Sequence, residues 1–390
     1  MARPDLSNTL AHISAPLDWV CLILGLVLVF IAGSSVMRTL VITRGSHSLV
    51  TRVVGGATRL SFRAVSRRFK NYYVRDRINT WLAPLDLMFF LFAWLILFLF
   101  GFALILRSDD HNDLIGALRE ARSSLFTLGF ATSNQTQLTL VDFIAAATGP
   151  IVIGLLVGYL PAHYAAYNRR EVDVAVLHAR AGEPNWGPEI LARRAEIDSG
   201  SSLDGLWTQW ERWSADVSES HTTYRMLIKT RSARPNRNWL VALLSVMDAA
   251  ALQVTLNPQL PQANTRTLLR QGIECLHDLT SSIERGKFPG LESRIDTTRP
   301  DHITLSFQEF ASAVDYLDQS GYEHSRTAEE AWPHFENWRI NYEYLAYGLA
   351  SDIDAVPALW SGPRHPPTPQ IPPMRPRYLV GGDSDPDMTF

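Results

Sequence analysis

The chain has 390 residues, room for two or three domains, and a formal net charge of −3 at pH 7. Its two cysteines form neither a metal-ligand spacing nor a disulfide framework, which fits a reducing compartment for the C-terminal half. Basic residues cluster beside long apolar runs, which excludes nucleic acid as the natural explanation for them.

Three apolar runs before residue 170 predict three membrane-spanning helices. They cover Trp19 to Met37, Leu87 to Leu106 and Phe143 to Ala166, and a spanning helix needs about 20 apolar residues. A cleaved signal peptide is the alternative for the first run, but the Asp-containing stretch before it and its length argue against one. The third run contains His163, which we interpret as a solvated residue at the membrane surface, with pH sensing as the alternative.

The distribution of basic residues predicts the orientation of the spans. The segment 44–79 carries eight arginines and one lysine against a lone Asp76, so this connection should be cytoplasmic. The N-terminus then lies outside the cell and the C-terminal half inside. Apolar residues among the arginines predict an amphipathic helix on the anionic inner leaflet, with lipid sensing as the more specific alternative.

A short helix is predicted between the second and third spans. It begins near Asp113, a favoured capping residue, and runs to Phe126. It is too short and too charged to cross a membrane. The sequence Thr127-Leu128-Gly129-Phe130 follows directly, and the third span comes after a polar linker.

The order of span, short helix, Thr-x-Gly-aromatic and span resembles the pore module of the potassium-channel superfamily over residues 80–170. Thr127, Leu128, Gly129 and Phe130 match the first four positions of its Thr-Val-Gly-Tyr-Gly filter, and Ala131 occupies the fifth. The resemblance implies a homotetramer whose carbonyl oxygens at these positions, with the Thr127 hydroxyl, bind a permeant monovalent cation such as K⁺. It implies no cofactor and no further metal. A plain turn between two helices is the alternative.

The sequence departs from this pattern in two places. Ala131 replaces the second glycine and Thr132 the usual aspartate, so either the outermost ion site is reshaped or potassium selectivity is relaxed. The short helix carries Arg119, Glu120 and Arg122 where the family has apolar or aromatic residues. Glu120 and Arg122 are candidates for pairing between subunits, and the arginines for an influence on permeation.

The third span contains glycines and prolines that suggest a gate or hinge. The candidates are Gly149, Pro150, Gly154, Gly158 and Pro161. We expect Pro161 to break or kink the helix near its inner end, with a gate around 159–167. Helix packing is the alternative reason for these residues, because glycine and proline are frequent in membrane helices.

The C-terminal half reads as helical. Trp239 to Leu256 is interrupted by polar residues and predicts a core helix instead of a span, and Thr265 to Ile283 predicts a second helix. Further helices are expected within 189–230 and 306–350. Two clusters are weak candidates for chemistry, and we interpret both as structural: Cys275, His277 and Asp278 for catalysis, and His324, Glu330, His334 and Glu336 for a metal.

These observations predict an all-α membrane protein: a pore-loop cation channel with an extra N-terminal transmembrane helix and a C-terminal helical cytosolic domain. The expected parts are residues 1–43 (outer N-terminus and first span), 44–79 (basic interfacial segment), 80–170 (pore module), 171–362 (cytosolic domain) and 363–390 (disordered proline-rich tail). The predicted function is a cell-membrane channel gated or assembled through the cytosolic domain, with an unidentified cytosolic ligand as a further candidate partner. The alternative is a membrane-anchored sensor with a degenerate or non-selective pore. No motif indicates an enzyme.

Overall fold

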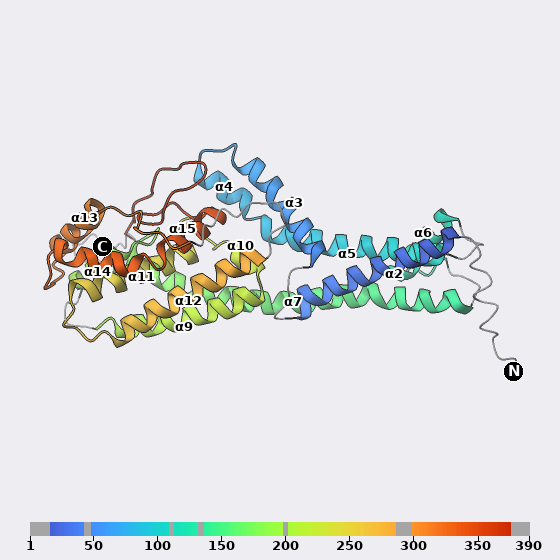
Figure 1. Ribbon diagram of the computed structural model, residues 1–390, viewed down its shortest axis with the longest axis horizontal. Coiled ribbons are helices and arrows are strands. Elements are labelled where there is room, and N and C mark those ends of the chain that lie inside the picture. Colours follow the sequence, from blue (N-terminus) through green and yellow to red (C-terminus); the bar gives the residue numbers. More distant parts are fainter. Residues whose placement is uncertain are drawn as a thin grey trace, which may run out of the picture. The chain divides into compact units, whose positions relative to one another are not determined.

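The computed structural model describes residues 16–42, 48–108, 113–131, 136–197, 202–285 and 298–375. Within these ranges the chain is helical, and β-structure is limited to isolated bridges between Glu183 and Met374 and between Ala358 and Ile371. The all-helical prediction is confirmed for this part of the chain. The elements (Figure 1) are α2 (Pro16–Val36), the π-helical η1 (Met37–Val41), α3 (Leu49–Ser66), α4 (Tyr72–Asn79), α5 (Leu82–Arg107), α6 (Leu114–Leu125), α7 (Thr136–Ala181), α8 (Gly187–Ile197), α9 (Asp204–Thr223), α10 (Met226–Lys229), α11 (Trp239–Leu256), α12 (Ala263–Arg285), α13 (Phe307–Gln319), α14 (Ala328–Arg339) and α15 (Glu343–Asp352).

The chain divides into two compact units. The first comprises Met1–Leu60 and Pro84–His163, and the second comprises Ser61–Ala83 and Tyr164–Phe390. The predicted interfacial segment 44–79 is therefore not a single part of the molecule. Its second portion, including α4, belongs to the same unit as the C-terminal half.

Among the described residues, four helical stretches are long and apolar enough to cross a membrane: Asp18–Val41, Tyr72–Arg107, Leu138–Ala181 and Trp239–Leu256. In the first three, which contain α2, α5 and α7, many apolar side chains face outward from their own unit, with Phe30 76% exposed. Such surfaces are compatible with contact to lipid. The fourth, α11, has all of its side chains buried, so its apolar character is explained by the protein core, as predicted.

A glycine contact brings α2 and α5 together in the first unit. A Cβ atom added to Gly25 would lie 2.6 Å from the carbonyl oxygen of Gly101 and 2.8 Å from Cγ1 of Ile105. Small residues allow membrane helices to approach closely, and the resulting packing replaces the hydrophobic driving force that lipid cannot supply. The N-terminal helix is thus packed against the helix that precedes the short helix α6.

Polar contacts connect the same two helices at both ends. The indole Nε1 of Trp94 donates a 2.8 Å hydrogen bond to Oγ of Ser35, which lies 2.6 Å from Oγ of Ser48. At the opposite end of α2, the carboxylate of Asp18 lies 3.7 Å from the guanidinium of Arg107. Buried polar groups need such partners, because water is absent from their surroundings.

One face of α7 is buried within the first unit, and its residues recur at spacings of three, four and seven. They are Asp142, Ala145, Gly149, Val152, Leu156 and His163. This 3.5-residue period is the pattern of helices packed along a single seam. The opposite face, which carries Pro150, Gly154, Gly158 and Pro161, is exposed in the single chain.

Two expectations for this helix were a break or kink at Pro161 and a solvated His163. α7 continues through Pro150 and Pro161 to Ala181 without a break, because an internal proline removes one hydrogen bond and the adjacent turns can retain theirs. A break at Pro161 is therefore excluded, and a kink stays a prediction. His163 is buried instead of solvated, and its ring centroid lies 5.9 Å from that of Tyr159. The sequence does not reveal that His163 falls on the inward-facing seam.

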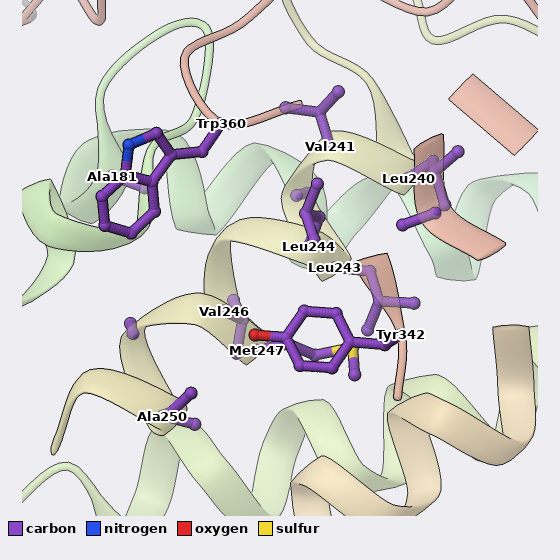
Figure 2. Close-up of a cluster of buried hydrophobic side chains, with 14 of the residues drawn as sticks. Ala181, Leu240, Val241, Leu243, Leu244, Val246, Met247, Ala250, Tyr342 and Trp360 are labelled. Carbon is purple, nitrogen blue, oxygen red and sulfur yellow. The ribbon is translucent and has the colours of Figure 1, made fainter. Parts of the chain in front are cut away.

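The second unit is organised around α11. Figure 2 shows apolar side chains of α11, such as Leu243 and Met247, in one cluster with Ala181, Tyr342 and Trp360 from other parts of the chain. The neighbouring helices α9 and α12 lie side by side along this unit (Figure 1).

A fully buried ion cluster lies against α11. The guanidinium of Arg339 lies 3.0 Å from the carboxylate of Asp248 and 2.7 Å from that of Glu343, and it donates to the hydroxyl of Tyr347 at 3.0 Å. The hydroxyl of Tyr342 donates to Asp248 at 2.8 Å. Such buried charges persist only with compensating partners, which explains how α11 tolerates an aspartate at its centre.

The prediction of a disordered tail is wrong for residues 363–375. The buried guanidinium of Arg364 donates to the carbonyl oxygens of Ala355 (2.7 Å) and Val356 (2.9 Å). Arg375 pairs with Glu189 at 2.8 Å and with Glu196 at 2.7 Å. Composition alone suggested disorder, but Arg364 has acceptors in the segment just before it, and Arg375 has acceptors that are distant in sequence. The remainder of the predicted tail lies outside the described residues.

The glycine contact predicts an asymmetric response to added methyl groups on α2. Gly25→Ala should separate α2 from α5 and lower the free energy of unfolding by about 1–3 kcal/mol, the usual effect of overpacking. The matched control is Gly33→Ala on the same helix, where an added Cβ meets nothing within 4 Å. Thermal unfolding of the detergent-solubilised variants measures the difference, and equal melting temperatures would contradict the predicted contact.

Candidate functional site

The short helix α6 forms where the sequence predicted it. The side chain of its N-cap, Asp113, accepts a 2.8 Å hydrogen bond from the amide of Gly116. This capping satisfies one of the amides that the first turn of a helix leaves unpaired. The helix ends at Leu125, and only its C-cap residue Phe126 separates it from the predicted filter residues.

The last turn of α6 is attached to α7 by two contacts. Oγ of Ser124 donates a 2.6 Å hydrogen bond to the carboxylate of Asp142, and both groups are buried. Gly149 lies so close to Leu125 that an added Cβ would overlap its carbonyl oxygen. The structure therefore assigns Gly149 a packing role, whereas Gly154 and Gly158 have open space beside their Cα atoms.

The backbone amides of the following loop turn back toward α6. The amide of Thr127 donates to the carbonyl oxygen of Ser124 at 2.9 Å, and the amide of Leu128 donates to that of Ser123 at 2.8 Å. The amide of Gly129 lies 3.5 Å from the same Ser123 oxygen, and that of Ala131 donates to the Ser123 hydroxyl at 3.0 Å. Non-helical backbone thereby gains partners for its donors.

The carbonyl oxygens of this loop are left available. Among the described residues, no hydrogen bond is accepted by the carbonyl oxygens of residues 127–130, and these residues are exposed in the single chain. The Thr127 hydroxyl donates to the carbonyl of Phe126 at 2.8 Å. Backbone carbonyl oxygens that accept no hydrogen bond from the described part of the chain are groups that can replace the hydration shell of a cation.

Positive φ angles occur at Thr127 (53°) and Gly129 (71°). Glycine adopts this region freely, whereas a residue with a Cβ atom there is destabilised by roughly 1–2 kcal/mol. Ala131, which occupies the position of the second filter glycine, is not among the described residues with positive φ. The structure places the strain on Thr127, where the two hydrogen bonds of its backbone and hydroxyl hold the turn.

Two arginines of α6 lie over the aromatic ring of the loop. The guanidinium carbons of Arg119 and Arg122 are 5.7 Å and 5.5 Å from the ring centroid of Phe130. These are cation–π distances, and they hold the arginines near the loop within one chain. Glu120 is buried, and its pairing with Arg122 of another subunit stays a prediction.

The second unit holds the segment that leads into α5. The buried guanidinium of Arg75 on α4 lies 3.0 Å from the carboxylate of Asp354, and Asp76 lies 2.5 Å from Arg231. The hydroxyl of Tyr72 donates to the carbonyl of Pro235 at 2.8 Å. The prediction that the whole basic segment lies on lipid is therefore wrong for α4, because its central charges are satisfied by protein groups.

The second unit also encloses the continuation of α7. The fully buried guanidinium of Arg170 donates to the carbonyl oxygens of Leu227 (2.9 Å) and Thr230 (3.0 Å) and lies 2.7 Å from the carboxylate of Glu171. The indole of Trp213 donates to the backbone carbonyl of Arg170 at 3.1 Å. Both helices that flank the loop thus have extensions anchored in this unit.

The other candidate residues do not assemble into a reactive site. Burial raises the pKa of the Cys275 thiol, which disfavours the reactive thiolate. Asp278 accepts a hydrogen bond from Ser218, and His324 lies between Asp318 and the carbonyl of Arg326. Among the described residues, no group of three or more His, Cys, Asp or Glu side chains could hold a metal.

Two cavities of the second unit are relevant to the predicted cytosolic ligand. One of about 880 Å³ is lined by residues that include Arg169, Gln209 and Asp216, and another of about 550 Å³ by residues that include Gln253 and Tyr322. Their volumes are in the range of small-molecule sites. The ligand itself stays a prediction.

Sequence reasoning missed the residues that shape the loop. Nothing in the sequence marks Ser123, Ser124 or Asp142 as important, because serines on a short helix and one aspartate at the start of a span are common. Comparisons with protein-family models, with curated proteins and with solved structures found no match. The assignment of this site consequently rests on its geometry.

The contact between α6 and α7 predicts that Gly149→Ala displaces the short helix. We expect it to lower the free energy of unfolding by about 1–3 kcal/mol through overpacking. Gly154→Ala on the same helix is the matched control, and it should be neutral or slightly stabilising, since alanine is the better helix former. Thermal unfolding measures both, and an unaffected Gly149→Ala variant would contradict the contact.

The attachment of α4 predicts that Asp354→Asn loosens this helix. Removing the carboxylate leaves Arg75 with a weaker partner, and we expect a loss on the order of 2 kcal/mol, below that of a fully buried pair. Hydrogen exchange of the amides in 72–79 should accelerate. Asp315→Asn, an exposed position of the same unit, is the control, and equal exchange in both variants would contradict the attachment.

Proposed function

We propose that the protein is a subunit of a homotetrameric cation channel, and that ions pass the carbonyl oxygens of residues 127–130. The proposal is based on a difference between the loop's amides, which have hydrogen-bond partners, and its carbonyl oxygens. Its amides donate to Ser123 and Ser124, and no described residue donates to its carbonyl oxygens. The bonds from Thr127 and Leu128, with positive φ at Thr127, are also those of an ordinary helix C-cap. What supports a pore over a plain turn is that this loop carries the Thr-x-Gly-aromatic sequence and follows a short helix between two long apolar helices.

The arrangement has the elements that cation passage requires. Irregular backbone at membrane depth is tolerated where it is buried in protein or lines a water-filled cavity. One chain supplies one row of oxygens, so a closed ring requires several copies with rotational symmetry. The C-terminal end of α6, which precedes Thr127 directly, carries the negative end of the helix dipole and favours a positive charge there.

Potassium is the ion that we propose. Gly129 supplies the positive φ that the resemblance to the potassium-channel filter requires at this position. Ala131 lacks the positive φ, which favours a reshaped outermost site over relaxed potassium selectivity. The proposal includes strict selectivity for potassium over sodium.

We further propose that the protein lies in the cell membrane with its second unit in the cytoplasm. The basic residues of 44–79 support this orientation. The anchoring of α4 through Arg75 and of α7 through Arg170 supports gating by this unit, because rearrangement there would act on both helices that flank the loop.

The test is planar-bilayer recording of the purified protein under a potassium/sodium gradient. We expect currents that reverse near the potassium potential, because carbonyl coordination favours the more easily dehydrated ion. Gly129→Asp should abolish them by placing a β-substituted residue at positive φ, and Gly33→Ala should leave them unchanged.

Other outcomes would change the proposal. Reversal near zero would indicate a cation channel without potassium selectivity. Currents that persist unchanged in Gly129→Asp would show that ions do not pass this loop. Silence of the intact tetramer under all conditions, including additions of cytosolic metabolites, would favour the membrane-anchored sensor with a degenerate pore.

A further inference from the structure

The helix α3 presents an exposed apolar row. Leu49, Val53 and Leu60 are 63%, 42% and 61% exposed, and their spacing places them on one face of the helix with the exposed Ala57. Isolated apolar side chains on a surface are unremarkable, but a row along one helix face indicates a contact surface.

A basic row runs beside the apolar row. Arg52, Gly56, Arg59 and Arg63 follow one another at spacings of four, three and four residues, and α3 contains no acidic residue. The two rows together form the pattern of a helix that lies in a membrane interface, with its cations at headgroup level.

The orientation of these rows is set by packing on the opposite side of α3. Val50, Thr51, Gly55 and Thr58 are buried. A Cβ at Gly55 would lie 3.5 Å from the ring of Phe90 on α5. Because this face is occupied by protein, the apolar and basic rows are directed away from the first unit.

Two arginines of the basic segment are paired with carboxylates of the second unit. Arg63 lies 2.6 Å from the carboxylate of Asp352, and Arg75 is paired with Asp354. Nε of Arg52 is buried and finds no hydrogen-bond partner among the described residues. Gly56, between Arg52 and Arg59 on the basic row, has nothing within 4 Å of an added Cβ, so an incoming group can reach the space between the two arginines.

We propose that α3 binds the surface of an anionic phospholipid leaflet, with lipid phosphates between Arg52 and Arg59 and with Leu49, Val53 and Leu60 among the acyl chains. The charge complementarity and the apolar row select a lipid surface over a protein partner. α3 is connected in the chain to α2 and α5, which are apolar enough to span the membrane. The inference goes beyond the proposed function, since lipid binding does not require conduction.

The experiment measures lipid binding to the full-length protein. Detergent-solubilised protein is titrated with phosphatidylglycerol or phosphatidylcholine, and bound lipid is counted by native mass spectrometry. We expect preference for phosphatidylglycerol, and Arg52→Gln/Arg59→Gln should weaken its binding about 30-fold, given a roughly fivefold contribution from each surface charge.

Three variants keep the test decisive. Lys70→Gln/Arg77→Gln removes the same charge from exposed positions outside α3 and should change affinity less than threefold. Arg52→Lys/Arg59→Lys should retain most of the binding, because the charge is preserved. The single variant Arg52→Gln, with an expected fivefold loss, serves if the double glutamine variant does not fold.

Two results would overturn the proposal. Equal losses in the α3 variant and the control pair would show that binding follows total charge and not this surface. Equal affinities of the unaltered protein for phosphatidylglycerol and phosphatidylcholine would show that no anionic lipid is recognised. Loss of conductance plays no part in the measurement, so failure here and failure of the channel proposal are distinguishable.

Discussion

The amides of Thr127, Leu128 and Gly129 face Ser123 and Ser124, and the candidate site depends on this constraint. An irregular segment between two apolar helices must satisfy its donors within the protein, because a membrane offers no water to do so. The amides are bound to the last turn of α6, and no described residue donates to the carbonyl oxygens of residues 127–130. The last turn of α6 is held on α7 by Asp142 and by the close approach at Gly149. The geometry of the loop therefore depends on the packing of these two helices.

The second unit is connected to the candidate site along the chain, through α4 and through the end of α7. It holds α4, which leads into α5, by the pair of Arg75 and Asp354, and it encloses the end of α7 around Arg170. Buried arginines of this kind require hydrogen-bond or ion-pair partners, because an unpaired guanidinium in the interior is strongly destabilising. They make α4 and the end of α7 parts of one folded unit, which gives the proposed gating a physical route.

Residues of similar appearance in the sequence have different roles in the structure. Gly149 and Gly154 both looked like hinge candidates, yet only Gly149 lies against another backbone. Arg52 and Arg75 belong to one basic segment, yet Arg75 pairs with the carboxylate of Asp354, whereas Nε of Arg52 has no hydrogen-bond partner among the described residues. The difference is decided by neighbours from distant parts of the chain, which local spacing does not specify.

The sequence by itself determined the helical class, the three apolar runs, the core character of Trp239–Leu256, and the short helix before Thr127. These follow from hydrophobic period, run length and capping, all of which act between residues close in the chain. Only the tertiary structure decided that Ser123 receives the loop's amides, that His163 faces inward, that α7 passes through Pro161, and that residues 363–375 are ordered. The burial of His163 and the order of residues 363–375 depend on packing within a whole unit. The bonds to Ser123 and the course of α7 through Pro161 involve residues close in the chain, but neither composition nor spacing specifies them.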